Sequence, residues 1–189
     1  LLAERVSLYQ KTNIVQAEKF SDLLNRSLSS YLKGLLTNEE VIQELLNLAK
    51  EISSSESAGN DLGLTREEKS FYDALTKPQA VQDVYTNEQL VAMTKELTEA
   101  LRKNRTIDWQ KKESARAGMR KMIKRLLKKY HYPPEEAANA LETVIRQCEQ
   151  WTDNEDTSSE PKLYSLQESS YSMAAESKTK YGNVENKTK

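Results

Sequence analysis

A dense run of basic side chains between residues 102 and 129 is the part of this sequence most able to do chemistry. Twelve lysines and arginines stand there against two acidic residues, a local charge of +10, although the whole chain carries only −1. Clustered cations can bind a phosphate backbone or another anionic surface, because they displace the counterions that surround a polyanion. The twelve basic residues are Arg102, Lys103, Arg105, Lys111, Lys112, Arg116, Arg120, Lys121, Lys124, Arg125, Lys128 and Lys129.

Half of these cations form a stripe on the helix that the sequence predicts after residue 109. Like charges four residues apart repel by a few tenths of a kcal/mol per pair, roughly, so the stripe indicates an anionic partner. The alternative is a solvated face that packs beside acidic helices of the same chain, since residues 1–101 carry −6 and residues 130–189 carry −5. Asn and Gln are absent from the stripe, which favours contacts to phosphates over base readout. The stripe consists of Arg116, Arg120, Lys124 and Lys128, widened by Lys121 and Arg125.

The other reactive side chains do not form a catalytic or metal site. The single cysteine, Cys148, lies on an apolar helical face and is expected to be a small core residue. The single histidine, His131, is expected to cap or pack near a helix C-terminus. The acidic cluster 153–156 lacks the glycine and terminal glutamate of a calcium loop. No Gly-rich phosphate loop, nucleophile elbow or helical H-E-x-x-H occurs, so we expect no catalytic residue, metal or cofactor in this segment.

The elements that must position the basic stripe are all predicted to be helices. Five glycines and four prolines disfavour a turn-rich β architecture, and apolar residues recur at three- and four-residue spacing. We expect one long helix over 1–33, ended at Gly34, and a loop or linker over the serine-rich run 53–60. A helix over 109–130 should begin after a cap at Asp108, and the last helix should reach residue 151. Three N-terminal capping boxes are predicted: Thr37 with Glu40, Thr65 with Glu68, and Thr86 with Gln89.

These elements predict an all-α fold, a compact helical domain of about five to six helices with a long N-terminal helix and a C-terminal tail. We divide the chain into a helical segment over 1–36, an all-α domain over 37–152, and a polar tail over 153–189. No stretch approaches 18 consecutive apolar residues, so no membrane span is expected. The chain begins without methionine or a signal pattern, and we expect it to be part of a larger protein.

Two groups of residues are expected to build structure around the stripe. One belongs to a short helix that ends at Pro78, and the other forms the corner before the basic helix and the restart after it. Amide, hydroxyl and carboxylate groups cap helix ends, and tryptophan anchors such corners. The residues are Thr65, Glu68, Phe71 and Tyr72 in the first group, and Asn104, Thr106, Asp108, Trp109, Tyr132 and Pro133 in the second.

Two stretches of the sequence resemble the C-terminal region of the restriction (motor) subunit of type I restriction enzymes. The first is LGLTREEKSFYDAL at 62–75, and the second is RKNRTIDW at 102–109 followed by YHYPP at 130–134. The resemblance covers residues 37–150, and the second block is the more specific of the two.

The resemblance implies a bacterial, cytoplasmic parent subunit that translocates DNA with ATP and Mg²⁺ and cleaves it, with nuclease and motor domains ahead of residue 1. This segment would then dock the parent onto a methyltransferase core of modification and specificity subunits, and contact the backbone of double-stranded DNA. A second hypothesis is a purely protein-docking domain that never touches DNA. A third, an enzyme in its own right, is disfavoured because the family's catalytic motifs match no position here.

Overall fold

The computed structural model describes residues 2–106 and 109–158, and within these ranges it contains eight helices and no strand. The predicted all-α class is confirmed, whereas the predicted number of five to six helices is too low. The helices are α1 (Leu2–Thr12), α2 (Ile14–Leu32), α3 (Asn38–Asp61), α4 (Arg66–Thr76), α5 (Gln79–Val84), α6 (Asn87–Asn104), α7 (Glu113–Lys129) and α8 (Pro134–Ser158).

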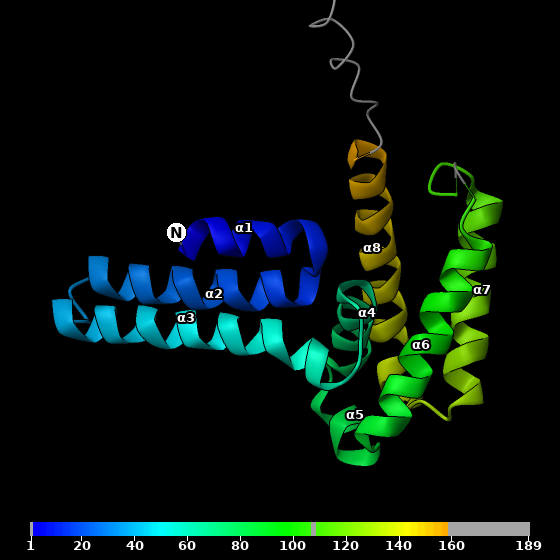
Figure 1. Cartoon of the computed structure of the whole chain (residues 1–189), viewed down its shortest axis with the longest axis horizontal. Helices are drawn as coiled ribbons and strands as arrows, with labels where there is room; N and C mark the ends of the chain where they lie inside the picture. Colours follow the sequence, from blue (N-terminus) through cyan, green and yellow to red (C-terminus); the bar gives the residue numbers. More distant parts are fainter. Residues whose placement is uncertain (1, 107–108, 159–189) are drawn as a thin grey trace, which may run out of the picture.

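The helices form two parts that we call the arm and the body. Helices α1, α2 and α3 lie side by side as the arm (2–61), which projects from the body (66–158) formed by α4 to α8 (Figure 1). Inside the body, α4 packs against α6 and α8, and α7 packs against the same two helices. Helices α1 and α2, which fall in the predicted segment 1–36, lie together with α3 in the arm.

The prediction of one long N-terminal helix over 1–33 is wrong, because the chain turns back on itself at Asn13. Asn13 has an extended backbone (φ −152°, ψ 98°), and its side chain accepts a hydrogen bond from the Gln16 amide at 3.1 Å. An asparagine in this role satisfies an unpaired amide at the start of a helix, so α2 begins anew at Ile14. The one sequence signal was the five-residue gap between Tyr9 and Ile14 in the apolar stripe.

The serine-rich run predicted as a loop over 53–60 is helical instead, since α3 continues to Asp61. Ile52 and Gly59 on this last part of α3 are buried, and the Lys69 side chain packs directly over Gly59. The low helix propensity of serine costs only a few tenths of a kcal/mol per residue, roughly, and tertiary packing overrides it.

The helix ends follow the predicted chemistry closely. All three capping boxes are present, with Thr37, Thr65 and Thr86 as N-caps. Gly34 ends α2 as predicted and has φ +70°, the left-handed conformation in which its amide and the next one reach back to the last carbonyls. His131 fills the same position after α7, with φ 59° and its amide bonded to the Lys128 carbonyl at 3.1 Å.

Two other predicted boundaries differ from the structure. Helix α7 begins at Glu113, because residues 109–111 form a turn and the N-cap Lys112 has an extended backbone. Helix α8 extends beyond residue 151 to Ser158. The predicted cap Asp108 and the part of the tail over 159–189 lie outside the described residues. Pro134 begins α8, which confirms the predicted break and restart.

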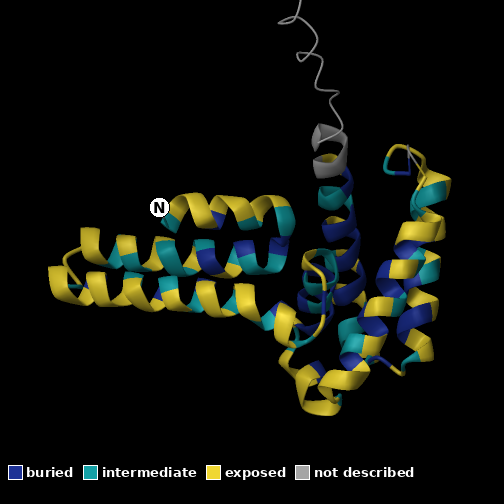
Figure 2. Cartoon of the chain, in the orientation of Figure 1, coloured by how far each residue is buried: buried dark blue, intermediate teal, exposed yellow. Residues whose placement is uncertain are grey.

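Burial is unequal between the two parts (Figure 2). The arm has a small core made by Val6, Phe20, Leu48 and Ile52. The core of the body runs through all five of its helices and buries its aromatic and aliphatic side chains almost completely. Its members are Phe71, Ala74, Leu75, Val81, Leu90, Met93, Leu97, Leu101, Trp109, Met119, Ile123, Leu126, Leu127, Tyr132, Ala140, Leu141, Val144, Ile145 and Cys148.

Candidate nucleic-acid interface

Helix α7 has one apolar face and one cationic face. The apolar side chains recur at three- and four-residue spacing and are buried against α6 and α8, which fixes the rotation of the helix about its axis. The cationic face is thereby turned away from the body core. The buried residues are Met119, Ile123, Leu126 and Leu127.

Four cations in the second half of α7 form the open part of the predicted stripe: Lys121, Lys124, Arg125 and Lys128. All four are exposed, and no carboxylate of the described chain lies within ion-pair distance of them. Seven residues separate the first of these cations from the last, so at a rise of 1.5 Å per residue the charges extend over about 10 Å of the helix. Their positive charge therefore remains available to an anion from outside the described part of the chain.

Other predicted members of the basic run are held by carboxylates of the same chain. Lys103 pairs with Glu99 at 2.6 Å and Arg116 with Glu149 at 2.8 Å. Arg102 pairs with Glu67, and Lys129 with Glu96 at 2.6 Å. The alternative interpretation, a face neutralised by the chain's own acidic helices, thus describes these four cations of the basic run.

Four further cations of the basic run, three before α7 and one within it, differ in their surroundings. The Arg105 guanidinium lies over the Trp151 ring, 4.2 Å from its centroid. Lys111 and Lys112 are exposed in the turn before α7, and Arg120 is half-buried. The structure therefore brings eight of the twelve cations onto α7 or its N-cap and leaves Arg102, Lys103, Arg105 and Lys111 at the corner before it.

The lysine and tyrosine at the C-terminal end of α7 share one carboxylate. Lys129 and the Tyr130 hydroxyl both donate to Glu96 on α6, the hydroxyl at 2.7 Å. The bond from Lys129, followed by that from Tyr130, holds the pKa of Glu96 below its usual value. The same hydrogen bond raises the pKa of Tyr130. This cluster joins α6 to α7 and orients the end of the cationic face.

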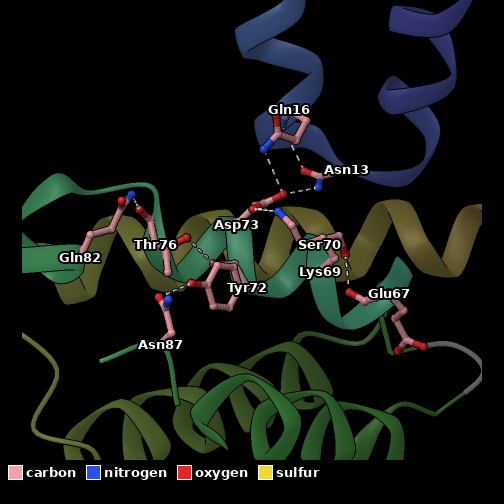
Figure 3. A network of polar contacts seen from close by, with 10 residues as sticks. All are labelled: Asn13, Gln16, Glu67, Lys69, Ser70, Tyr72, Asp73, Thr76, Gln82 and Asn87. Atoms are coloured by element: carbon pink, nitrogen blue, oxygen red, sulfur yellow. Dashed lines mark hydrogen bonds and ion pairs between the residues drawn. The ribbon is translucent and has the colours of Figure 1, made fainter. Parts of the chain in front are cut away.

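The residues expected to build the first structural group do so. Thr65 and Glu68 form the capping box of α4, with the Thr65 amide donating to the carboxylate at 2.8 Å. Phe71 is fully buried and meets Trp151 edge to face at 5.9 Å. Tyr72 is half-buried, and its hydroxyl reaches Asn87 at 3.5 Å (Figure 3).

The second structural group also lies where the corner was expected. Asn104 donates to the Ala100 carbonyl at 2.8 Å, and the Thr106 carbonyl accepts from the Trp109 amide at 3.1 Å. The Trp109 indole is fully buried and donates to Thr152 at 3.1 Å.

The restart after α7 is anchored in the body core. The Tyr132 hydroxyl donates to the Leu75 carbonyl at 2.7 Å, and burial strongly raises the pKa of Tyr132. The Pro133 carbonyl accepts from the Ala137 amide at 3.0 Å, within the first turn of α8.

The sequence did not predict the polar network that joins the arm to the body. The Asn13 amide donates to Asp73 on α4 at 2.7 Å, Gln16 donates to the same oxygen at 3.1 Å, and Lys69 pairs with the other oxygen (Figure 3). Asn13 and Gln16 lie about sixty residues before Asp73 in the chain, so no local pattern could have found these two contacts.

A second buried contact completes this joint from α8. The Gln147 side chain accepts from the Ile14 amide at 2.9 Å and donates to the Thr12 carbonyl at 3.0 Å. It therefore satisfies both backbone groups freed where the chain turns between α1 and α2. A polar residue on an apolar helical face was its only signal in the sequence.

The reactive side chains outside the basic run have the following surroundings in the described residues. Cys148 is buried in the body core. No group of three or more histidine, cysteine or acidic side chains in the described ranges is arranged to hold a metal ion. None of the helices that the structure describes has the length and apolar character needed to cross a membrane.

Comparisons with known proteins agree with the resemblance seen in the sequence. The family model "Type I restriction enzyme HindI endonuclease subunit-like, C-terminal" matches residues 1–154. The chain is 38% identical over 149 residues to the type I restriction enzyme HindI endonuclease subunit of Haemophilus influenzae. It is 31% identical over 130 residues to the putative type I restriction enzyme MjaIXP endonuclease subunit of Methanocaldococcus jannaschii. No solved structure matches this chain.

These matches cover most of the chain but little of the relatives. They include 79% and 68% of this chain, yet only 14% and 12% of the HindI and MjaIXP subunits, respectively. The two stretches that carry the resemblance, 62–75 and 102–134, lie inside the span of the family model. The chain therefore belongs to the family of HindI-like type I restriction endonuclease subunits, of which it represents the C-terminal domain.

Proposed function

We propose that this domain docks a type I restriction endonuclease subunit onto its methyltransferase core and contacts the DNA backbone without sequence preference. The face of α7 with Lys121, Lys124, Arg125 and Lys128 is the observation that carries the DNA contact. The relatives' names, which describe endonuclease subunits of restriction enzymes, support the setting in which DNA is near.

The chemistry of the face favours phosphates over bases. Its four cations project from a helix whose rotation is fixed by a buried apolar face, so they are presented together as one surface. Ammonium and guanidinium groups bind phosphate through charge and hydrogen bonds, whereas base readout usually also requires amide side chains that this face lacks. A duplex of any sequence would satisfy the same contacts.

Duplex binding across a salt series tests the DNA contact. If all four cations meet phosphates, the logarithm of the affinity should fall with the logarithm of the salt concentration with a slope of about 3–4. Replacing any one of the four by glutamine should lower this slope by about one, for duplexes of unrelated sequence alike. A slope near zero, or binding that depends on base sequence, contradicts the proposal.

A matched pair of charge-reversed variants separates the face from bulk charge. The face variant replaces the four residues by glutamate. The control replaces four exposed cations without an ion pair among the described residues, on the arm and at the start of α4: Arg26, Lys33, Lys50 and Arg66. Both variants change the net charge equally, so only the face variant should abolish duplex binding. Equal losses would show that net charge alone drives binding.

The alternative, a protein-docking domain without DNA contact, predicts a different outcome for the same variants. The acidic partner would then be a modification or specificity subunit. The face variant would lose assembly with the methyltransferase core, measured by gel filtration of the mixed subunits, while its affinity for duplex DNA stayed unchanged.

The activity of the full subunit is inferred from the family alone, because the chain spans only a small part of the length of its relatives. We infer from the family that the full subunit translocates DNA with ATP and Mg²⁺ and cleaves it in the cytoplasm. This domain would position the subunit on the methyltransferase core and bind the DNA backbone, and the catalytic residues would lie elsewhere in the subunit. The purified domain should therefore show no ATPase or nuclease turnover with Mg²⁺, and measurable turnover would revive the hypothesis of an enzyme in its own right.

A further inference from the structure

The distal tip of the arm carries a concentration of exposed apolar side chains. Of the eight large apolar residues that are exposed in the described part of the chain, six lie within residues 28–46, around the turn between α2 and α3. Figure 2 shows this end of the arm as largely exposed. Exposed apolar side chains that gather in one region mark an interaction surface. The six are Leu28, Tyr31, Leu32, Leu35, Ile42 and Leu46.

Near the body, the corresponding surface of the arm is covered by α1. Leu2, Val6 and Tyr9 of α1 pack into one apolar cluster with residues of α2 and α3. The Tyr9 ring meets Phe20 of α2 edge to face at 5.1 Å. The three α1 residues recur at four- and three-residue spacing, which keeps one face of the helix on this cluster.

Beyond the first residues of α1, the same line of apolar residues continues along both partner helices. On α2, Leu28 follows Leu24 by one turn and is 41% exposed. On α3, Ile42 lies one turn before Leu45 and is 56% exposed. Helix α1 runs alongside α2 in the opposite direction and starts beside the middle of it, short of the tip (Figure 1). The exposed patch is thus continuous with an interface that the arm already uses.

We propose that, in the full-length subunit, the polypeptide immediately ahead of α1 continues this helix and covers the apolar tip of the arm. Its direction follows from the fold, since a helix extended backwards from Leu2 runs along α2 toward Leu32. The comparisons support the presence of such a polypeptide. The family model describes a C-terminal region, and the HindI subunit is about seven times as long as the segment that matches this chain. Eight residues separate Leu24 from Leu32, so about eight to ten helical residues, or roughly 12–15 Å, suffice.

The proposal specifies the pattern of the covering segment. To stay in register with Leu2, Val6 and Tyr9, apolar residues should stand three and seven residues ahead of Leu2. Polar residues at both positions, or a proline between them, overturn the proposal, because neither permits an amphipathic helix on this surface.

Site-specific photo-crosslinking in the full-length subunit tests the occupant directly. A benzophenone amino acid at Ile42 should crosslink to a peptide within about the ten residues ahead of Leu1, identified by mass spectrometry. The control places the same amino acid at Gln43, which is exposed at the same level of α3 but about 100° further round the helix. The yield of this crosslink should be at least tenfold lower from Gln43.

The other results overturn the proposal. A crosslink from Ile42 to the motor domains, to a methyltransferase subunit or to a second copy of the subunit identifies a different occupant. No crosslink above the Gln43 control means that the tip stays open in the subunit. A helix that is extended and covers the tip also predicts protection of 28–46 in hydrogen exchange of the full subunit, and the absence of this protection counts equally against it.

Discussion

The arm and the body are built from the same kind of amphipathic helix, yet they differ in how completely these helices are covered. In the body, α4 and α7 each pack against both α6 and α8, so the apolar faces of these helices cover one another. In the arm, α1 covers only the half of α2 and α3 near the body. A well-capped helix therefore does not reveal in its own sequence whether its apolar face has a partner.

The joint between the two parts contains several directed polar contacts. Asp73 and Gln147 hold the turn at Asn13, and Glu18 of α2 bonds both Lys77 of α4 and Arg146 of α8. Polar contacts with fixed directions determine the angle of the arm more narrowly than apolar contacts would, since hydrogen bonds weaken steeply when misaligned. The following changes test how far the arm and the body differ.

The largest difference should appear when one leucine is truncated in each part. Leu97 is fully buried in the body, whereas Leu32 is 82% exposed on the arm. Leu97→Ala should lower the free energy of unfolding by about 2–5 kcal/mol, because it leaves a cavity. Leu32→Ala should change it by less than about 0.5 kcal/mol. Urea unfolding of the isolated domain measures both, and similar losses would mean that the arm tip is packed.

Breaking the joint should have an intermediate effect that is specific to the arm. Gln147→Leu leaves the Ile14 amide and the Thr12 carbonyl buried without a partner, which should cost about 1–3 kcal/mol. Hydrogen exchange should accelerate in α1 and α2 before it does so in α6 and α7. Uniform acceleration in all helices would show that the arm and the body unfold as one unit.

Two of the three capping boxes, one in the arm and one in the body, allow the same chemical change in both parts. Thr65→Ala, at the start of α4, should lower the free energy of unfolding by about 1 kcal/mol. Thr37→Ala removes the equivalent cap at the tip of the arm, where fraying of α3 exposes little buried surface. Its effect should therefore be local, seen as faster exchange over the first turns of α3 with a smaller change in global stability. An equal global loss would contradict the distinction.

The smallest expected effect is a pH dependence at the joint. The hydrogen bond from Lys77 is the largest cause that holds the pKa of Glu18 below its ordinary value of 4.5. A carboxyl with a lowered folded pKa adds stability above the unfolded value, and this stability is lost as the pH falls through the folded pKa. The difference in unfolding free energy between wild type and Glu18→Gln should be constant from about pH 5 to 7 and shrink below about pH 4.5. If the difference in unfolding free energy between the two proteins does not change with pH, the charge of Glu18 does not contribute to the stability of the joint.

Much of the fold could be predicted because it depends on local chemistry. The capping boxes at Thr37, Thr65 and Thr86, the stop at Gly34 and the restart at Pro134 are decided by residues within a few positions of each other. The turn at Asn13 could not be found in the same way, because the apolar spacing is nearly helical across it. The serine-rich end of α3 was predicted as a loop because its helical state depends on contacts such as that of Gly59 with Lys69.

The candidate site divides in the same manner. The sequence placed Lys121, Lys124, Arg125 and Lys128 on one helical face, since the 3.6-residue period relates residues of a single helix. It could not separate them from Arg116 and Lys129, whose carboxylate partners Glu149 and Glu96 come from other helices. Whether the open cations bind DNA stays a prediction.

By itself, the sequence determined the helical class, most helix ends and the cationic character of α7, because these follow from neighbours in the chain. Only the tertiary structure decided which cations are paired, how the arm joins the body and which apolar face is left open. Those outcomes depend on residues tens of positions apart, and no local pattern encodes their meeting.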